Sequence, residues 1–514
     1  MKKILTTVIA CSLVLTLTAC AELEAVISQY TESDSTQSTS QSSYTSDSSD
    51  SSDSSGTVQN MTTLTEIETA DMFTERDLET DYDTSSATQI NLNNETVTIS
   101  AEGVYILSGT ISDGQVIVEV SDSEKVQLIL DGVTINSNSS AAIYVKSANK
   151  VFVSLAENSE NTLSVSGEYV AIDDNNIDGA IFSKSDITFN GNGTLTINAD
   201  YGHGIVGKDD VVFTSGTYYI TSENHGISVN NSIRIANATF SIISGKDGIQ
   251  AEHDEDASLG YVYIESGTFV IASTADCITA SSLLQVDSGD FALQSGGGYV
   301  EVLNTITVGE GSGSYSQTTD SLEYSMKCFK SEEMIFNGGS FVLSAYEDTI
   351  HANANLTINA GDFYISTGDD AVHADDDLII NGGIIDIAVG YEGLEGNNIT
   401  INDGDISIVV LDDGINASVG VLTINGGDIY VYCIGDGMDS NGDFVMTGGT
   451  VIMDVNSYYT GGDGDFDISG SITYTGGTVT DADGNTIDPS ESSMSMGGSM
   501  SGGFSSGFSG GFKR

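Results

Sequence analysis

The sequence predicts an all-β fold, a right-handed parallel β-helix of about 22 residues per coil with an N-terminal β cap. The first observation is an internal repeat between Gly202 and Asp465, in which small or acidic residues precede an aliphatic or aromatic anchor. Seven of the nine anchor spacings lie within one residue of 22, a period that fits a β-propeller or a β-sandwich poorly. The anchors are Ile205, Ile227, Ile249, Ile278, Phe329, Ile350, Val372, Leu394, Ile415 and Met438.

The second observation is the composition. The chain has 514 residues, with 58 Gly, 1 Pro and no Trp, and its Val, Ile, Thr and Tyr occur in short alternating runs that are typical of strands. An aliphatic run such as Leu356–Ile358 is followed by a Gly turn and a second run such as Phe363–Ile365. Because no helical pattern separates these runs, we expect each coil to pair in parallel with its neighbours, about 4.8 Å apart.

Residues 1–19 are expected to form a lipoprotein signal peptide. Lys2 and Lys3 precede a short apolar run, and the residues that end at Ala19 and Cys20 resemble the bacterial lipobox. We therefore expect Cys20 to be lipidated and to anchor an extracellular protein to the cell membrane, with the lipid as its membrane contact. The alternative is an ordinary secretory signal that happens to contain a cysteine.

Four further segments follow the signal peptide. The first is so rich in Ser, Thr and Asp that it cannot bury enough apolar surface to order itself. A distinct section before the regular repeat can shield the end of a solenoid core from water, and we expect a short helix or cap at Met72–Leu78. The predicted segments are a disordered linker at 20–59, the N-terminal cap and first coils at 60–170, the regular parallel β-helix at 171–488 and a disordered Gly/Ser/Met/Phe tail at 489–514.

The formal net charge of −61 restricts the partners. It argues against binding to nucleic acid or to an anionic membrane surface, and it suits a protein that binds cations outside the cell. The alternative is that acidic loops keep a long β-protein soluble. We interpret Cys277, Cys328 and Cys433, which fall at repeat positions, as small buried residues and not as disulfide partners.

Equivalent positions of successive coils form columns in a β-helix, and two columns beside the anchors carry polar residues. Neighbouring carboxylates about 4.8 Å apart repel by roughly 3 kcal/mol at an effective dielectric constant near 20, so consecutive carboxylates require raised pKa values or a cation. The first column, two positions before each anchor, reads His203, His225, Asp247, Asp276, Lys327, Asp348, Asp370, Glu392, Asp413 and Asp436. The second column, one position after each anchor, reads Val206, Ser228, Gln250, Thr279, Lys330, His351, His373, Glu395, Asn416 and Asp439.

Calcium is the expected cation, because it takes about six to eight oxygen ligands in a flexible geometry. Zinc is not favoured, since the histidines are few and no Cys/His spacing matches a zinc motif. The alternative is that turn positions favour Asp for local backbone hydrogen bonds. The main predicted site is Glu392, Glu395, Asp413, Asp436 and Asp439, extended by Asp348 and Asp370 with His351 and His373 beside them. A second predicted site is Asp247 with Glu252, Asp254 and Asp256, in a loop of seven extra residues after Ala251.

Lys327 and Lys330 lie at the edge of a strongly acidic region. The chain from Ser331 to Phe512 contains 29 acidic residues and no Lys or Arg. The simpler interpretation is that the two lysines neutralise Asp276 and Asp348. The alternative is that one of them acts as a base beside bound Ca²⁺ and abstracts the proton α to a uronate carboxylate, which would give β-elimination.

The chain resembles a known family, the clostridial carbohydrate-binding β-helix lipoproteins, which share the pectate-lyase-like fold. The resemblance covers about Phe73 to Val479 and implies binding of cellulose-like and acidic polysaccharides, with calcium and without established catalysis. The sequence departs from the family pattern at Cys277, where Gly is preferred, and at Lys327–Lys330, where Lys-Gly-Ile-Lys is expected. The motifs that carry the resemblance are Phe73–Glu79, Val126–Val133, Ala142–Ser147, Lys246–Ala251 and the repeated Asn-Gly-Gly turns.

We therefore predict a lipid-anchored extracellular protein that binds a polysaccharide, either a polyuronate or a cellulose-like chain, through residues 171–488 in a calcium-dependent way. Two alternatives stay open. One is a calcium-dependent pectate lyase with Lys330 or Lys327 as the base. The other is a structural surface stalk without a ligand.

Overall fold

The structure is a computed structural model that describes residues 67, 69–80, 84–299, 324–455 and 464–492. The predicted signal peptide, Cys20 and the predicted linker at 20–59 lie outside the described residues, as do residues 493–514 of the predicted tail.

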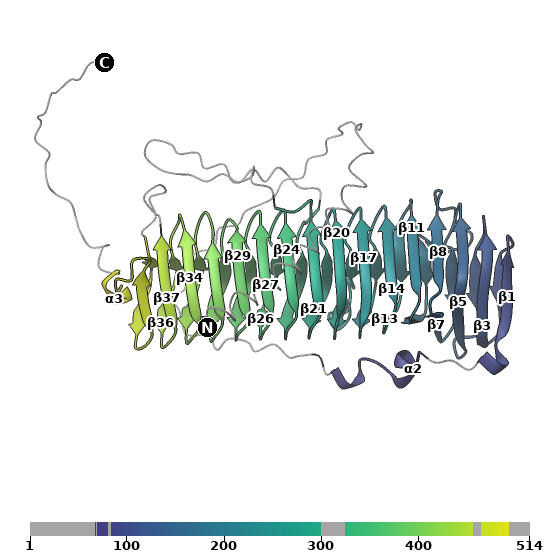
Figure 1. Cartoon of the computed structure of the whole chain (residues 1–514), viewed down its shortest axis with the longest axis horizontal. Coiled ribbons are helices and arrows are strands. Elements are labelled where there is room, and N and C mark those ends of the chain that lie inside the picture. The colour runs from purple at the N-terminus through teal and green to yellow at the C-terminus, as the bar shows by residue number, and fades with distance from the viewer. Residues whose placement is uncertain (1–66, 68, 81–83, 300–323, 456–463, 493–514) are drawn as a thin grey trace, which may run out of the picture.

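The described chain winds into stacked coils that form a parallel β-helix (Figure 1). Its strands belong to one sheet of 40 strands, and each strand pairs in parallel with the equivalent strand of the coils before and after it. The predicted all-β parallel solenoid is thus confirmed. The strands fall on three faces, which we call the anchor face, the second face and the third face in the order in which the chain passes through them.

The anchor face carries the predicted anchors, which stand in register from Ile205 to Met438. In β25, Ile350 and Ala352 are buried whereas His351 between them is partly exposed, so the second column points outward. The strands of this face are β2 (Val97–Ile99), β4 (Val116–Glu119), β6 (Ile143–Ser147), β9 (Gly179–Ser183), β12 (His203–Gly207), β15 (Ile227–Val229), β18 (Ile249–Ala251), β25 (Ile350–Ala352), β32 (Ile415–Ala417), β35 (Met438–Ser440) and β38 (Phe466–Ile468).

The second and third faces complete each coil. The second face contains β7 (Lys150–Leu155), β10 (Asp186–Gly191), β13 (Val211–Phe213), β16 (Ser232–Ile235), β19 (Tyr261–Ile264), β26 (Leu356–Ile358), β33 (Leu422–Ile424), β36 (Phe444–Met446) and β39 (Ile472–Tyr474). The third face contains β8 (Glu160–Val165), β11 (Thr194–Ala199), β14 (Thr217–Ser222), β17 (Ala238–Ser244), β20 (Gly267–Ser273), β22 (Asp290–Ser295), β24 (Ser340–Ala345), β27 (Asp362–Thr367), β29 (Ile384–Val389), β31 (Asp405–Val409), β34 (Asp428–Cys433), β37 (Thr450–Val455) and β40 (Thr478–Asp481).

Some longer strands continue from one face to the next. Strands β3 (Gly103–Ile111) and β5 (Lys125–Ser137) span the second and third faces. The strands that span the anchor and second faces are β21 (Ile278–Val286), β23 (Phe329–Phe336), β28 (Val372–Ile380) and β30 (Leu394–Ile401). Strand β1 (Thr88–Asn93) pairs with β3 and lies at the N-terminal end of the solenoid (Figure 1).

An aromatic ladder fills the core behind the third face. Six aromatic residues occupy one register position of consecutive coils, and each ring stacks on the next with centroids 4.3 to 5.4 Å apart. Stacking of this kind contributes beyond the burial of apolar area, so the ladder ties consecutive coils together. Its members are Tyr218, Phe240, Phe269, Phe291, Phe341 and Phe363.

An asparagine ladder stabilises the turns between the second and third faces. Each amide donates to the side-chain oxygen of the preceding coil, as Asn381 does to Asn359 at 2.7 Å and Asn402 to Asn381 at 2.7 Å. The glycine that ends the turn has a positive φ, for example 99° at Gly383, a conformation that L side chains rarely adopt. This geometry explains the repeated Asn-Gly-Gly turns of the sequence.

An N-terminal strap, formed by Ile67 and Thr69–Glu79, runs along the flank of the solenoid. It contains η1 (Thr69–Asp71) and α2 (Glu75–Leu78), and η2 (Thr84–Ser86) follows it. The backbone N–H of Ile67 donates to Gln285, whereas Asp77 contacts Lys150 several coils earlier. The predicted helix at Met72–Leu78 is therefore present, but it packs against the side of the second face and not over the end of the core (Figure 1).

Cys277, Cys328 and Cys433 are buried and free, as expected. The segment predicted as a tail begins with a short helix, α3 (Pro489–Ser492). Within the described ranges, no helix combines the length and the apolar character required to cross a membrane.

Candidate functional site

The first column lies in the turns that enter the anchor face, and its carboxylates connect consecutive coils. In five of these residues, one carboxylate oxygen accepts the backbone N–H of the equivalent residue one coil further on. These bonds run from Asp276 to Asp247 (2.9 Å), Lys327 to Asp276 (2.8 Å), Asp370 to Asp348 (3.2 Å), Asp436 to Asp413 (2.6 Å) and Gly464 to Asp436 (2.8 Å). Backbone hydrogen bonding therefore accounts for much of the recurrence of Asp in this column.

A cavity of about 460 Å³ opens beside the two columns at the coils of β15 to β25. Its wall includes Lys246, Lys330 and Tyr324, and the ammonium of Lys246 lies 5.7 Å from the centroid of the Tyr324 ring. Gln250, Glu252, Asn353 and other polar residues complete the lining. Two cations and an aromatic ring thus face one hollow of a protein whose net charge is −61.

Asp276 is a buried carboxyl group in the wall of this cavity. Burial and the nearby charge of Asp247 raise its pKa to about 6, although the positive charge of Lys330 acts in the opposite direction. A carboxyl group with a raised pKa beside a lysine, in a cavity, is the type of arrangement found at functional sites.

Lys327 and Lys330 have different surroundings. The Lys327 ammonium lies 3.1 Å from Asp348 Oδ2 and 3.6 Å from Glu347 Oε2. Burial opposes the charge of Lys327, but these two carboxylates outweigh it and raise its pKa. Lys327 is therefore suited to neutralising charge and poorly suited to acting as a base, whereas Lys330 lines the cavity.

Potential metal ligands converge at the C-terminal side of Lys327, where Asp348, Asp370 and Glu395 of the predicted metal residues lie. Within the described residues, the groups of three ligating atoms within 4.8 Å of one another are Asp348–His351–His373, Asp370–His373–Glu395 and Asp348–Asp369–Asp370. Glu392, Asp413, Asp436 and Asp439 of the main predicted cluster belong to none of these groups. The physical reason is that three residues of one column span two coil spacings, roughly 9.6 Å, which is too far for one ion.

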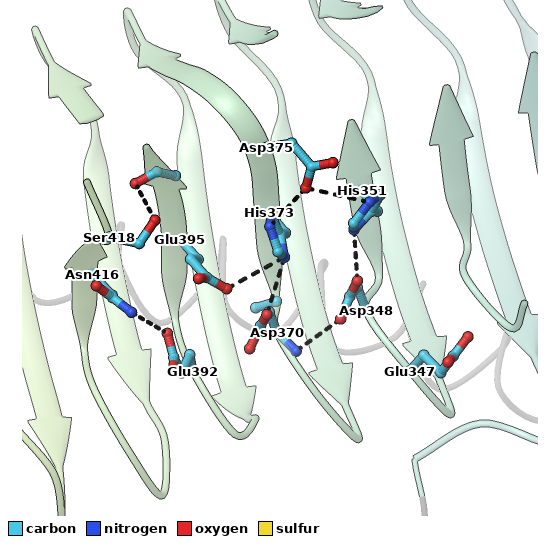
Figure 2. Close-up of polar contacts among 12 residues, drawn as sticks. Glu347, Asp348, His351, Asp370, His373, Asp375, Glu392, Glu395, Asn416 and Ser418 are labelled. Carbon is cyan, nitrogen blue, oxygen red and sulfur yellow. Dashed lines mark hydrogen bonds and ion pairs between the residues drawn. The ribbon is translucent and has the colours of Figure 1, made fainter. Parts of the chain in front are cut away.

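Two imidazoles lie at the centre of this convergence. The rings of His351 and His373 have centroids 4.6 Å apart, and Figure 2 shows acidic groups on opposite sides of them. His351 Nδ1 lies 2.8 Å from Asp348 Oδ2, and His373 Nδ1 lies 3.2 Å from Asp370 Oδ2. His373 Nδ1 also lies 3.3 Å from Glu395 Oε2.

The pKa values of two buried carboxyl groups in this region, Asp348 and Asp370, are shifted in opposite directions. Burial disfavours the charge of Asp348, but His351 and Lys327 outweigh it and hold its pKa well below the usual range. Burial and the charges of Asp348 and Asp369 raise the pKa of Asp370 well above the usual range. The two adjacent carboxyl groups thus differ because the Lys327 ammonium contacts Asp348, whereas the charges that act on Asp370 come from neighbouring carboxylates.

The acidic end of the columns is crowded. Burial and the neighbouring Glu395 raise the pKa of Glu392 to about 8, while the Asn416 amide donates to Glu392 at 3.0 Å. Burial raises the pKa of Asp413 to about 7, with contributions from nearby carboxylates. The side-chain oxygen of Asn416 is buried without a hydrogen-bond donor among the described residues.

The second predicted calcium site does not assemble. Asp247 pairs with His225 Nδ1 at 3.1 Å, and Glu252 accepts a hydrogen bond from Gln250 at 2.6 Å. Asp256 accepts hydrogen bonds from Ser258 within the exposed loop, and Asp254 is exposed as well. In the described part of the chain, no group of three closely spaced ligands includes Asp247, Glu252, Asp254 or Asp256. The loop turns on itself, because His253 Nδ1 accepts two backbone N–H groups, and its carboxylates do not meet.

Sequence reasoning placed the histidines in the second column but did not count them as ligands. The spacing of His351 and His373 by one coil was the available signal, since residues one coil apart in a column become neighbours. The cavity was missed because its wall combines both columns with Lys246 and Tyr324, which are distant in the sequence.

Known proteins share sequence and structural similarity with parts of this chain. A relative from Acetivibrio thermocellus, described as a carbohydrate-binding domain-containing protein, is 40% identical over 129 residues, which are 25% of this chain. The chain spans 45% of that relative's length. A solved structure, of a polysaccharide lyase-like protein from C. thermocellum as a gadolinium derivative, is 33% identical with a TM-score of 0.40. The similarity covers 41% of this chain and 91% of that one.

The family model described as "Carbohydrate-binding domain-containing protein" matches residues 93–371 and 369–502. These matches cover most of the coils and both columns. The chain therefore belongs to the carbohydrate-binding domain-containing protein family.

Proposed function

We propose that this chain is a cell-surface protein that binds polysaccharide in the cavity beside the first column and along the adjoining anchor face. The family supports carbohydrate as the class of ligand. The observation that supports this location for the binding site is the cavity of about 460 Å³, which has a size typical of ligand sites and has Lys246 and Lys330 in its wall. Two ammonium groups there favour a polyuronate, whose carboxylates they can bind, over a neutral cellulose-like chain.

Calcium is part of this proposal. The crowded carboxyl groups of Glu392 and Asp413 repel one another, and the buried Asn416 oxygen is the kind of ligand that Ca²⁺ accepts. Because these residues do not converge on one point, the carboxylates of the sugar would have to complete the coordination shell. We therefore expect Ca²⁺ to bind weakly to the protein alone and more tightly in the presence of polyuronate.

The location at the cell surface rests on the sequence. Cys20 in its lipobox-like context would carry the lipid, and the Ser/Thr/Asp-rich segment that follows would serve as a tether. Replacement of Cys20 by Ser should release the protein from the membrane fraction and abolish its labelling with a fatty-acid analogue. Retention in the membrane fraction by Cys20→Ser would contradict the anchor.

Retention on immobilised polygalacturonate and on cellulose, with Ca²⁺ or with EDTA, tests the binding proposal. Lys330→Ala or Lys246→Ala should weaken binding to polyuronate roughly ten- to a hundredfold, the equivalent of one charge-assisted hydrogen bond. The matched control is Lys184→Ala, which removes an exposed lysine outside the cavity and should leave binding unchanged. Equal binding by all three variants would refute the cavity as the binding site. If the wild type is retained on neither polymer, the structural stalk is favoured.

A second candidate function is a polysaccharide lyase with Lys330 as the base. Its position in the cavity near Asp276 favours this residue over the ion-paired Lys327. A lyase would release unsaturated oligouronates, which are detected by their ultraviolet absorbance. If Lys330→Ala loses product formation while it still binds polymer with Ca²⁺, the lyase is supported. If the wild type retains polymer without forming any product, the protein is a binder.

A further inference from the structure

His373 lies between carboxylates that approach both nitrogens of its ring (Figure 2). On one side, His373 Nδ1 lies 3.2 Å from Asp370 Oδ2 and 3.3 Å from Glu395 Oε2. On the other side, His373 Nε2 lies 3.2 Å from Asp375 Oδ1. Asp370 precedes His373 on the same coil, and Glu395 on β30 is the direct register partner of His373 on β28. The register of the β-helix thus brings one nitrogen and two carboxylate oxygens together from two coils.

The contact with Asp375 orients the ring of His373. When Nε2–H donates to Asp375, the lone pair of the neutral ring is on Nδ1, where it faces the oxygens of Asp370 and Glu395. A lone pair and two carboxylates on one side repel one another unless a cation lies between them. An imidazole whose other nitrogen donates to a carboxylate is also the usual form of a metal-binding histidine.

We propose that His373 Nδ1, Asp370 Oδ2 and Glu395 Oε2 bind one transition-metal dication, which we assign as Zn²⁺. These residues form one of the groups in the described chain whose ligating atoms all lie within 4.8 Å of one another. Zn–N and Zn–O bonds of about 2.0–2.2 Å in a tetrahedron place ligand atoms about 3.3–3.5 Å apart. The observed separations of 3.2 and 3.3 Å from His373 Nδ1 are close to that requirement.

The nitrogen ligand distinguishes this site from the proposed calcium site. Ca²⁺ takes oxygen ligands, whereas imidazole nitrogen suits zinc and its neighbours among the transition metals. The side chains of His373 and Glu395 are each 20% exposed, so water can reach the fourth coordination position.

The neighbouring group of Asp348, His351 and His373 is less suitable for a metal ion. The Lys327 ammonium lies 3.1 Å from Asp348 Oδ2 and already neutralises that carboxylate. The sequence from Ser331 to Phe512 contains no Lys or Arg, and the ion pairs that Asp370 and Glu395 make in the described coils are with His373. A cation is therefore needed more at Asp370 and Glu395 than at Asp348.

A competing explanation is that Asp370 keeps a proton and donates it to Glu395, so that the three groups form only a hydrogen-bonded cluster. Metal titration separates the two explanations, because a cluster held by protons alone has no stoichiometric affinity for Zn²⁺. The zinc proposal does not depend on carbohydrate binding, and its failure would leave the polysaccharide and calcium proposals unaffected.

The test is titration of the chelator-treated full chain with Zn²⁺ by calorimetry, and with Co²⁺ by visible absorption. We expect one equivalent of Zn²⁺ and a cobalt spectrum typical of nitrogen and oxygen ligands. His373→Gln should weaken binding at least a hundredfold, and Glu395→Gln and Asp370→Asn at least tenfold each. Asp375→Asn, which changes only the orienting carboxylate, should weaken it about ten- to a hundredfold.

Two histidine variants serve as controls, and circular dichroism verifies that each variant is folded. His203→Gln removes a column histidine that lies near none of the three ligands, and His351→Gln removes the neighbouring ring that belongs to the other group. Both should bind one equivalent with an affinity within about threefold of the wild type. The proposal is overturned if the folded wild type binds no Zn²⁺, if Glu395→Gln binds it with wild-type affinity, if either control loses it, or if equimolar Ca²⁺ displaces it.

Discussion

Replacement of Asp77 by Ala should detach the N-terminal strap from the solenoid. The Asp77 side chain is buried, and its Oδ1 lies 2.7 Å from Lys150 Nζ and accepts a hydrogen bond of 2.6 Å from Thr188. Its Oδ2 caps α2 by accepting hydrogen bonds from the backbone and hydroxyl of Thr74. One side chain thus joins the strap to two strands of the second face and also begins the helix.

The expected cost follows from these contacts. Removal of one partner from a buried ion pair costs about 3–5 kcal/mol, because the other charge is left without compensation. Here the remaining charge is Lys150, whose side chain is only 12% exposed. Because the strap lies outside the core, the loss should appear as local opening and not as unfolding of the coils. An opening constant raised by about a hundredfold to a few thousandfold corresponds to that energy.

Hydrogen exchange of the strap amides, followed by mass spectrometry, measures this opening. Glu79→Ala is the matched control on the same segment, because Glu79 pairs with Arg76 at an exposed position and should contribute less than about 1 kcal/mol. Strap exchange that is equal in the wild type and in Asp77→Ala, or equally fast in both variants, would refute the assigned role of Asp77.

Three further predictions concern pH and the core. Burial raises the pKa of Asp77, but hydrogen bonds from Lys150 and other groups outweigh it and lower the pKa to about 2, below the unfolded value of about 3.9. The ionised Asp77 therefore stabilises the folded strap above about pH 4, and this stabilisation is lost towards pH 2. Pepsin cleavage within the strap should therefore increase across that interval, and Asp77→Ala should show no such increase. The pKa of Asp276 is raised to about 6, so stability should fall as pH rises from about 4 to about 6. Asp276→Asn should remove this fall, which urea midpoints at the two pH values report; an unchanged pH dependence contradicts the shift. Phe291→Ala opens the aromatic ladder and should lower the free energy of unfolding by about 3–5 kcal/mol in urea titrations, whereas Tyr219→Ala, at a 49% exposed position, should change it by less than about 0.5 kcal/mol.

The coil register could be predicted because it depends on periodicity. Ile350, Val372 and Leu394 recur at intervals of 22 residues, and a parallel solenoid places residues separated by one coil side by side. The two polar columns could be predicted from the same period of about 22 residues. The role of Asp in the first column could be stated only as an alternative, since the sequence does not reveal which backbone N–H faces each carboxylate.

The contacts of Asp375 could not be predicted from the two columns. Asp375 belongs to neither column, and its approach to His351 and His373 depends on how β28 continues from the anchor face towards the second face. The path of the strap was equally inaccessible, because the contact between Asp77 and Lys150 joins segments without a shared repeat. Periodicity predicts neighbours within the solenoid, whereas contacts made by aperiodic segments require coordinates.

The regular spacing of the coils also limits how far charge is felt along the rod. The Debye length at physiological ionic strength is about 8 Å, and the coil spacing is about 4.8 Å. Adjacent charges in a column therefore influence each other strongly, whereas charges two coils apart are largely screened where solvent reaches them. A linear polyanion bound along the columns would interact with each coil mainly through the charges of that coil and its neighbours. A substitution in one coil should therefore alter binding locally and leave binding at more distant coils unchanged.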